Sequence, residues 1–167
     1  LTARDKGIIK DLLLSYGLSF ISRGRGKDSK IGKLLYMVRA DIQLLSIVVS
    51  FKPDLFLSFS SPYAAQVAFL LRKPHIVLND TEHTDKMHSR FTYPFSSVIL
   101  TPQSYQNKIG MKQIRFNNIV EGLYLHKNYF APNSDVISLL NLGSHTEFVI
   151  LRFVSWNAHH DYGQSGI

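Results

Sequence analysis

The chain has 167 residues, and the hydrophobic share of 45% is enough to bury a core of single-domain size. It contains no cysteine, which excludes a disulfide framework and a thiolate metal site and suits a cytoplasmic protein. The formal net charge is +7, and no uninterrupted apolar run approaches the roughly 20 residues that span a bilayer.

The first half of the chain alternates helix-like and strand-like segments. Residues 5–16 form a predicted helix that ends at Gly17, and 18–22 form a short strand. Residues 31–51 have apolar side chains at steps of three and four, which predicts a long helix that ends at Lys52-Pro53. Residues 54–59 read as a buried strand. The next helix starts with Ser61 as N-cap and Pro62 at its first position, and runs to 71.

The second half continues the alternation. The predicted segments are a strand over 75–78, a polar loop, a strand over 97–100, a short helix near 104–108, strands over 113–116 and 147–154, and a helix over 135–141. Repeated β-α-β units with short apolar strands predict an α/β fold, with a Rossmann-like parallel sheet and helices on both faces.

Two features indicate a fragment of a longer protein. The chain opens on LTARD, typical of a strand running into a helix, and closes on GQSGI, typical of a continuing loop. The turn formers of 126–135 predict a domain boundary, with an incomplete first domain over 1–130 and the linker and start of a second domain over 131–167.

The positive charge concentrates in residues 22–33, which carry five basic side chains: Arg23, Arg25, Lys27, Lys30 and Lys33. Such a patch can contact nucleic acid, anionic lipid headgroups or a phosphorylated substrate, or it can be a solvated loop. Because no aromatic residue interleaves with the basic ones, nucleic acid is the least favoured of these partners.

Polar residues follow most of the predicted strands, and in open α/β sheets ligands bind at the carboxyl ends of parallel strands. NDTEHTD, residues 79–85, is the richest cluster. We expect Glu82 or Asp80 to act as a general base, with His83 positioning the carboxylate or contacting a phosphate. The alternative is that Asp80 or Thr81 caps the following helix.

Other candidate ligand contacts lie at neighbouring strand ends. Ser61 begins a helix whose free N–H groups can bind an anion, although it can equally be an ordinary cap, and Thr101 follows the strand 97–100. A metal ion could be bound by the adjacent side chains His159, His160 and Asp161. Because the HEXXH and His-x-His patterns of metal sites are absent, we predict no metal.

Several motifs resemble one family in the same order: TARD, KPDL, SSPYAAQVAFLLRKPHIVLNDTEH, PFSSVILTP, NYFAP and LRFVSWNAHHDYGQSGI. The chain resembles the domain of unknown function 354 family of archaea and bacteria. That family is placed with the GT-B glycosyltransferases and the UDP-N-acetylglucosamine 2-epimerases.

The resemblance implies the N-terminal half of a GT-B protein, with an acceptor site here and a donor nucleotide site in a second domain. It also implies that this chain lacks the first strand and the loop after it, and is inactive alone. Epimerases carry a glutamate close to the position of Glu82. We therefore expect a sugar-nucleotide-dependent glycosyltransferase without a cofactor, or alternatively a nucleotide-sugar 2-epimerase or a non-catalytic domain.

In that setting the C-terminal segment is a cleft loop, or else an ordinary loop. The residues expected to contact donor phosphates there are Arg152, Ser155, His159, His160 and Asp161. The expected partners are a nucleotide sugar and a lipid-linked or glycan acceptor, with the basic segment touching the inner face of an anionic membrane.

Overall fold

The computed structural model describes residues 1–5, 8–26, 29–133, 135–140 and 147–151. Two short strands come first, β1 (Thr2–Ala3) and β2 (Ile21–Ser22), separated by the helix α1 (Ile9–Ser15). The long helix α2 (Lys30–Phe51) leads into the strand β3 (Phe56–Phe59), the helix α3 (Pro62–Leu70) and the strand β4 (His75–Leu78).

After β4 the chain forms a 3-10 turn, η1 (Glu82–Thr84), the helix α4 (Asp85–Phe91) and a second 3-10 turn, η2 (Tyr93–Phe95). The strands β5 (Val98–Pro102) and β6 (Gln113–Phe116) follow, and then the short helices α5 (Gly122–Leu125) and α6 (Asp135–Leu139).

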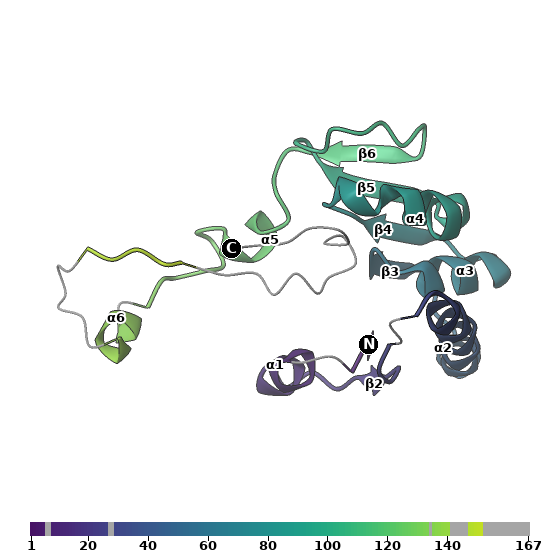
Figure 1. The fold of residues 1–167 in the computed structure, drawn as a ribbon, viewed down its shortest axis with the longest axis horizontal. Helices are drawn as coiled ribbons and strands as arrows, with labels where there is room; N and C mark the ends of the chain where they lie inside the picture. Colours follow the sequence, from purple (N-terminus) through teal and green to yellow (C-terminus); the bar gives the residue numbers. More distant parts are fainter. Residues whose placement is uncertain (6–7, 27–28, 134, 141–146, 152–167) are drawn as a thin grey trace.

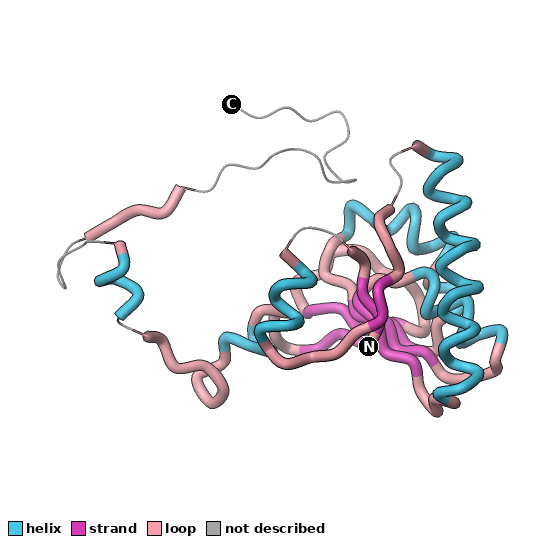
Figure 2. Tube along the Cα trace, turned by 90° about the horizontal axis from the view of Figure 1, so that it is seen from below, coloured by secondary structure: helices cyan, strands magenta, loops and turns pink. Residues whose placement is uncertain are grey.

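The main sheet has four parallel strands in the order β3-β4-β5-β6 (Figure 1). A separate parallel pair consists of β1 and β2. The predicted α/β class with a parallel sheet and interleaved helices is confirmed. Figure 1 draws α1 and α2 on opposite sides of the pair β1–β2, and Figure 2 shows the same elements from below.

The core lies between the main sheet and the helices α2 and α3. One cluster of buried side chains joins these helices to β3, and consists of Leu44, Val48, Phe56, Ala64, Val67 and Ala68. A second cluster of Val77, Tyr93 and Ile99 packs the η2 turn onto the two central strands. Alternate residues of β4 are buried, as expected for a sheet covered on one face.

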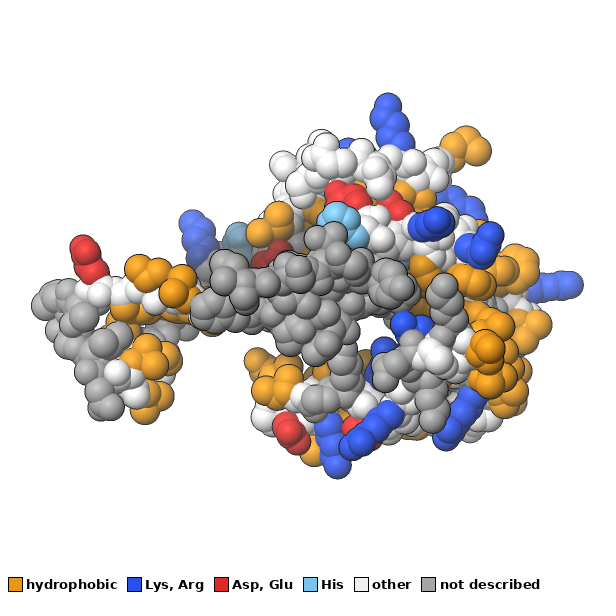
Figure 3. Space-filling view, in the orientation of Figure 1, with side chains coloured by type: hydrophobic (Ala, Val, Ile, Leu, Met, Phe, Trp, Pro, Cys, Tyr) orange, Lys and Arg blue, Asp and Glu red, His pale blue; other side chains and the backbone are white. Residues whose placement is uncertain are grey.

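Of the described helices, α2 alone is long and apolar enough over Ile31–Phe51 to cross a membrane, by length and composition only. Its Tyr36, Ala40, Leu44 and Val48 are buried, at the four-residue spacing of one helix face. The helix α2 connects two strands and packs on α3, but only 22% of this apolar stretch is buried among the described residues. Figure 3 shows hydrophobic side chains gathered on the side of the molecule where α2 and α3 lie.

Most predicted elements are confirmed with small shifts in their ends, and β4 and β6 begin and end where predicted. Three predictions are wrong. The predicted polar loop after β4 contains α4. Residues 104–108 form no helix; a turn in which the Tyr105 N–H donates to the Pro102 carbonyl is found there instead. Residues 147–151 are extended chain without a strand partner in the described part; residues 152–154 of that prediction lie outside it.

Candidate functional site

The carboxyl ends of β3, β4 and β5 are tied together by polar side chains. Ser60 follows β3 with a left-handed φ of 48° and directs its hydroxyl to the next strand end. The Ser60 Oγ lies 2.9 Å from Asn79 Oδ1 and 3.2 Å from the Leu78 carbonyl oxygen. One hydroxyl proton thus links the first residue after β3 to the end of β4.

Asn79 is fully buried and connects this edge to two tyrosines. Its Nδ2 donates to the hydroxyl of Tyr93 at 2.7 Å and to that of Tyr105 at 3.0 Å. Its Oδ1 accepts the backbone N–H of Thr81 at 3.3 Å. A buried amide with four partners fixes the start of the 79–85 loop, because leaving any of these groups unpaired costs free energy.

Asp85 completes the network from the first position of α4. The carboxylate Oδ1 accepts the hydroxyl of Tyr93 at 2.6 Å and also that of Tyr105, while Oδ2 accepts the Asn107 side-chain amide at 2.9 Å. Burial, and then the hydrogen bond to Asp85, raises the pKa of both tyrosines. The two phenols therefore stay protonated and act as donors.

The three predicted catalytic residues lie on the loop that this network supports. Glu82 begins η1, and its Oε1 accepts the backbone N–H of Gln106 at 2.9 Å. Asp80 is half-buried, and its Oδ1 accepts the Thr81 hydroxyl at 2.8 Å. The His83 side chain is exposed. The structure thus brings two carboxylates to the carboxyl edge, with one oxygen of each held by a neighbour.

Neither Asp80 nor Thr81 caps a helix through its side chain: Thr81, the N-cap of η1, makes no side-chain cap hydrogen bond. At the start of α3 the predicted cap is confirmed, since the Ser61 Oγ accepts the Ala64 N–H at 3.4 Å. Thr101 is fully buried and its Oγ1 accepts the Gln113 amide at 3.0 Å. Nothing in this geometry offers the Thr101 hydroxyl to a ligand.

The basic residues of 22–33 do not form one exposed surface. Arg23 is half-buried, with its guanidinium 4.9 Å from the centre of the Tyr63 ring, whereas Arg25 and Lys33 are exposed. Lys27 and the side chain of Lys30 lie outside the described residues. So do all of the C-terminal candidates, namely Arg152, Ser155, His159, His160 and Asp161. No group of three or more metal-ligating side chains occurs in the described part of the chain.

The sequence did not point to Asn79, Asp85, Tyr93, Tyr105 or Asn107 as a unit. Only the polar run 79–85, which contains Asn79 and Asp85, is visible as a local pattern in the sequence. The two tyrosines come from later segments, because Tyr93 follows α4 and Tyr105 follows β5. Asp85 and Tyr105 are 20 positions apart, so no spacing rule of a helix or strand connects them.

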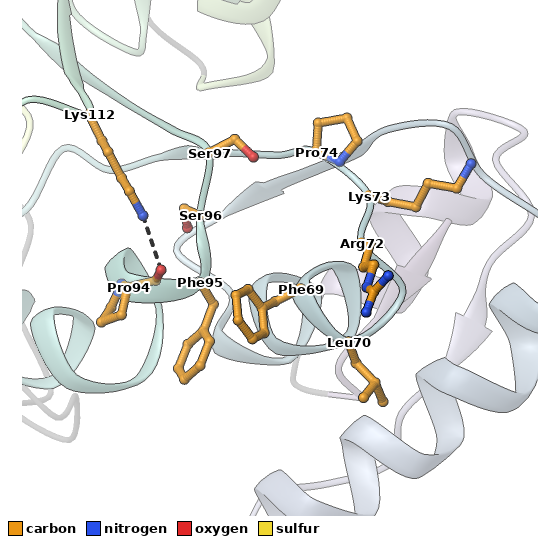
Figure 4. Close-up of a pocket in the computed structure, with 10 residues that line it drawn as sticks. All are labelled: Phe69, Leu70, Arg72, Lys73, Pro74, Pro94, Phe95, Ser96, Ser97 and Lys112. Atoms are coloured by element: carbon orange, nitrogen blue, oxygen red, sulfur yellow. Dashed lines mark hydrogen bonds between the residues drawn. The ribbon is translucent and has the colours of Figure 1, made fainter.

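Two cavities in the described part of the chain adjoin each other, with Pro94 and Lys112 in the walls of both. One of about 780 Å³ opens at the amino edge, where Phe69, Arg72, Ser96 and Lys112 are among its lining residues (Figure 4). A second, of about 680 Å³, has Asp85 and Asn107 in its wall. We place the candidate site at the carboxyl edge because parallel-sheet chemistry concentrates there, and the larger cavity lacks carboxylates altogether.

A buried histidine predicts acid sensitivity. His75 at the start of β4 is fully buried between the hydroxyls of Ser58 and Ser96, at 2.9 and 3.0 Å, and burial lowers its pKa to about 4. A depressed folded pKa means that its stabilising contribution is complete above the unfolded pKa of about 6.5 and is lost toward pH 4. We expect the free energy of unfolding to fall by up to about 3 kcal/mol across that range.

Urea unfolding at pH 7 and pH 4.5, with NMR titration of the His75 ring, measures this effect. Replacement of the exposed His83 with Gln serves as the control for the loss of a histidine that is not buried. A His75 ring that titrates close to pH 6.5 would show that the imidazole is not held neutral by burial.

Comparison with known proteins gives two matches. The family described as "Protein of unknown function (DUF354)" matches residues 1–162. An uncharacterised protein of Methanocaldococcus jannaschii is 25% identical over 162 residues, covering 91% of this chain. The chain spans about half the length of that relative, 47%. No solved structure matches the chain.

Proposed function

The chain belongs to the DUF354 family, and from that premise we propose that the full-length protein is a sugar-nucleotide-dependent glycosyltransferase of GT-B architecture. In this proposal the described sheet is the core of the acceptor-binding domain. The donor nucleotide binds mainly to a second domain of the longer protein. The reaction takes place between the two domains.

One observation carries the proposal: two carboxylates, Asp80 and Glu82, follow β4 on a loop whose start is held by the buried Asn79 and whose Glu82 is held by Gln106. Glu82 Oε1 is held by Gln106, and its Oε2 makes no hydrogen bond to the described residues. A carboxylate fixed through one oxygen has the other oxygen available to take a proton from a bound hydroxyl. The first turn of α3 and the loop after β5 border the same edge.

The reaction follows from that arrangement. Glu82, or Asp80 in its place, accepts the proton of an acceptor hydroxyl, and the resulting oxygen attacks the anomeric carbon of the donor sugar. The bond from that carbon to the diphosphate oxygen breaks, and a nucleoside diphosphate leaves with the electron pair. Helix N-termini and basic side chains stabilise the negative charge that develops on the leaving group.

The test uses the full-length protein with a panel of uridine, guanosine, adenosine and cytidine nucleotide sugars. Each is supplied with and without a mixture of lipid and glycan acceptors. Release of the free nucleotide that depends on an acceptor supports the proposal.

Because Glu82 also lies near the epimerase glutamate position, the second candidate is a 2-epimerase, for which epimer formation needs no acceptor. If the folded protein turns over no nucleotide sugar in either arm, both enzymatic functions fail.

The proposal extends to a peripheral contact with the inner face of an anionic membrane through the exposed Arg25 and Lys33. Each basic residue near such a surface contributes about 1 kcal/mol, so replacing both with Gln should weaken binding roughly tenfold or more. Co-sedimentation with phosphatidylserine vesicles at two salt concentrations measures this loss of membrane binding. Lys86 and Arg90, exposed on α4, are the matched control pair. Equal loss from both pairs, or no binding, contradicts the contact.

A further inference from the structure

The larger cavity, of about 780 Å³, opens at the amino ends of the strands, on the other edge of the sheet from the proposed catalytic loop. Three of the residues that line it, Pro74, Ser97 and Lys112, stand immediately before β4, β5 and β6. The proposed reaction uses none of the residues in its wall. The cavity is therefore a candidate for a second ligand site.

The wall of this cavity is basic. It includes Arg72, Lys73 and Lys112, and no acidic side chain of the described residues lines it. Lys73 forms an ion pair with Asp54 at 3.3 Å, but the Asp54 side chain is fully exposed, and such a surface pair is weak enough to yield to a ligand. The Arg72 guanidinium makes no salt bridge within the described part of the chain. An excess of positive charge with little internal compensation favours an anionic ligand.

The turn that ends α3 fixes where two of these cations leave the backbone. The Arg72 N–H donates to the Phe69 carbonyl at 3.0 Å, and the Lys73 N–H donates to the Ala68 carbonyl at 2.9 Å, which is the Schellman pattern. Arg72 adopts the left-handed conformation of this turn, with a φ of 55°. Glycine is the usual residue there, so arginine occupies a position that glycine would adopt without strain.

Two further donors lie in the wall beside the strands. The Lys112 Nζ donates to the Pro94 carbonyl at 3.0 Å (Figure 4) and lies 3.4 Å from the Tyr93 carbonyl oxygen. An ammonium group has three protons, so one remains for a ligand. The Ser97 Oγ accepts the His75 N–H at 3.2 Å and donates to none of the described residues. Its hydroxyl proton is therefore also available to an anion.

An apolar surface lies beside these polar groups. The rings of Phe69 and Phe95 pack edge to face with their centroids 5.4 Å apart, and Phe69 is 61% exposed. Figure 4 draws Lys112 and Arg72 on opposite sides of this pair of rings. Small-molecule sites combine an apolar lining with a few placed polar groups, and this wall has both.

We propose that the amino-edge cavity binds a small molecule that carries a phosphate group next to a flat apolar group. The forked guanidinium of Arg72 binds the phosphate oxygens, Lys73 and Lys112 add positive charge, and Ser97 donates its hydroxyl proton. Three cations without a lining carboxylate suit the double charge of a phosphate monoester better than a single carboxylate. Phe69 packs against the apolar group. The inference does not depend on the proposed enzymatic function.

The test is a titration of the full-length protein with phenyl phosphate at low salt, because salt screens exposed charges. Calorimetry gives the Kd, and amide NMR gives the location. The amides of Arg72, His75 and Ser97 should shift, because the last two share a hydrogen bond that changes when Ser97 donates to the ligand. The amides of Asp80 and Glu82, at the carboxyl edge, should not shift.

Probes that carry half of the ligand define its chemistry. Inorganic phosphate and benzyl alcohol should each bind at least roughly tenfold more weakly than phenyl phosphate, since each uses one part of the wall. Benzoate that binds as tightly as phenyl phosphate would contradict a phosphate site. Shifts confined to the carboxyl edge, or no binding by a protein that does turn over nucleotide sugar, would overturn this site without touching the proposed function.

Arg72→Gly and Lys52→Gly form a matched pair of variants. Each removes one exposed cation from a left-handed position, with φ of 55° and 52°, so both should keep the Tm within a few degrees. Only Arg72 lines the cavity. Arg72→Gly should weaken phenyl phosphate binding at least roughly tenfold, and Lys52→Gly by less than about twofold. Equal losses, or no loss from Arg72→Gly, would contradict the site.

Phe69→Ala tests the apolar half of the site. It should remove the preference for phenyl phosphate over inorganic phosphate, because both probes then use only the polar part of the wall. Phe51→Ala, which changes another exposed phenylalanine outside the cavity, should keep that preference. A preference that survives Phe69→Ala would show that the aromatic pair does not contact the ligand, and the proposed ligand class would be wrong.

Discussion

Replacing Glu82 with Gln in the full-length protein is expected to lower the turnover of nucleotide sugar by about 10²- to 10⁴-fold, the usual contribution of a general base. The amide oxygen of Gln can still accept the Gln106 N–H, so the loop keeps its anchor. The amide cannot take the acceptor proton. Because substrate contacts remain, the loss should fall on kcat rather than on KM.

Two controls separate chemistry from structure in this experiment. Glu82→Ala removes both the base and the anchor, so it should add a loss of loop order to a similar loss of rate. Asp11→Asn changes an exposed carboxylate on α1 and should leave the rate unchanged. If Asp80→Asn abolishes turnover while Glu82→Gln keeps it, the base is Asp80; if turnover survives the double substitution, neither of these two carboxylates is the base.

The largest effect on stability is expected at Asp85. Asp85→Ala leaves the hydroxyl protons of Tyr93 and Tyr105 and the Asn107 amide without their acceptor. A hydrogen bond to a charged group stabilises the folded protein by about 1.5–3 kcal/mol. At this partly exposed site, water can replace some of the lost hydrogen bonds and so reduce the cost of the substitution. We expect the free energy of unfolding to fall by roughly 3 kcal/mol, measured by urea unfolding of the 167-residue chain.

Asp80→Ala is the matched control, because the Asp80 carboxylate accepts only the neighbouring Thr81 hydroxyl among the described residues. Its cost should stay under about 1 kcal/mol. Tyr105→Phe removes a single hydrogen-bond donor, so its loss of unfolding free energy should lie between those of Asp85→Ala and Asp80→Ala. Equal costs for Asp85→Ala and Asp80→Ala would show that the tyrosine network does not stabilise this edge.

Local rules of sequence account for much of the fold. Pro74 before an apolar run and Ser61-Pro62 before another set the ends of β4 and α3. Those signals lie within a few residues of the element they define. The alternation of such segments was enough to predict the α/β class and the parallel sheet.

The sequence did not predict α4, for a physical reason. The segment DKMHSRF has only Met87 and Phe91 as apolar members, so it lacks a wide apolar stripe. The helix is instead fixed by polar contacts, among them the Asp85 carboxylate and the hydrogen bond of His88 Nδ1 to Thr92 at 2.9 Å. Partners such as Tyr105 are distant in the chain, and no local pattern identifies them.

The sequence predicts the edge of the sheet at which Asp80 and Glu82 lie, but it does not predict which residues hold them there. Parallel strands bring the 79–85 loop to the ligand edge, and the positions of Asp80 and Glu82 there follow from topology alone. What holds Glu82 is the backbone N–H of Gln106, in a segment expected to be helical. Glu82 and Gln106 are 24 positions apart, so no local pattern links them.

The most direct measurement for the proposed function is the release of free nucleotide from nucleotide sugars by the purified full-length protein, with acceptors present and absent. We predict turnover of one nucleotide class that requires an acceptor and places the sugar on that acceptor's hydroxyl. A folded full-length protein that neither binds nor turns over any nucleotide sugar would contradict the proposal.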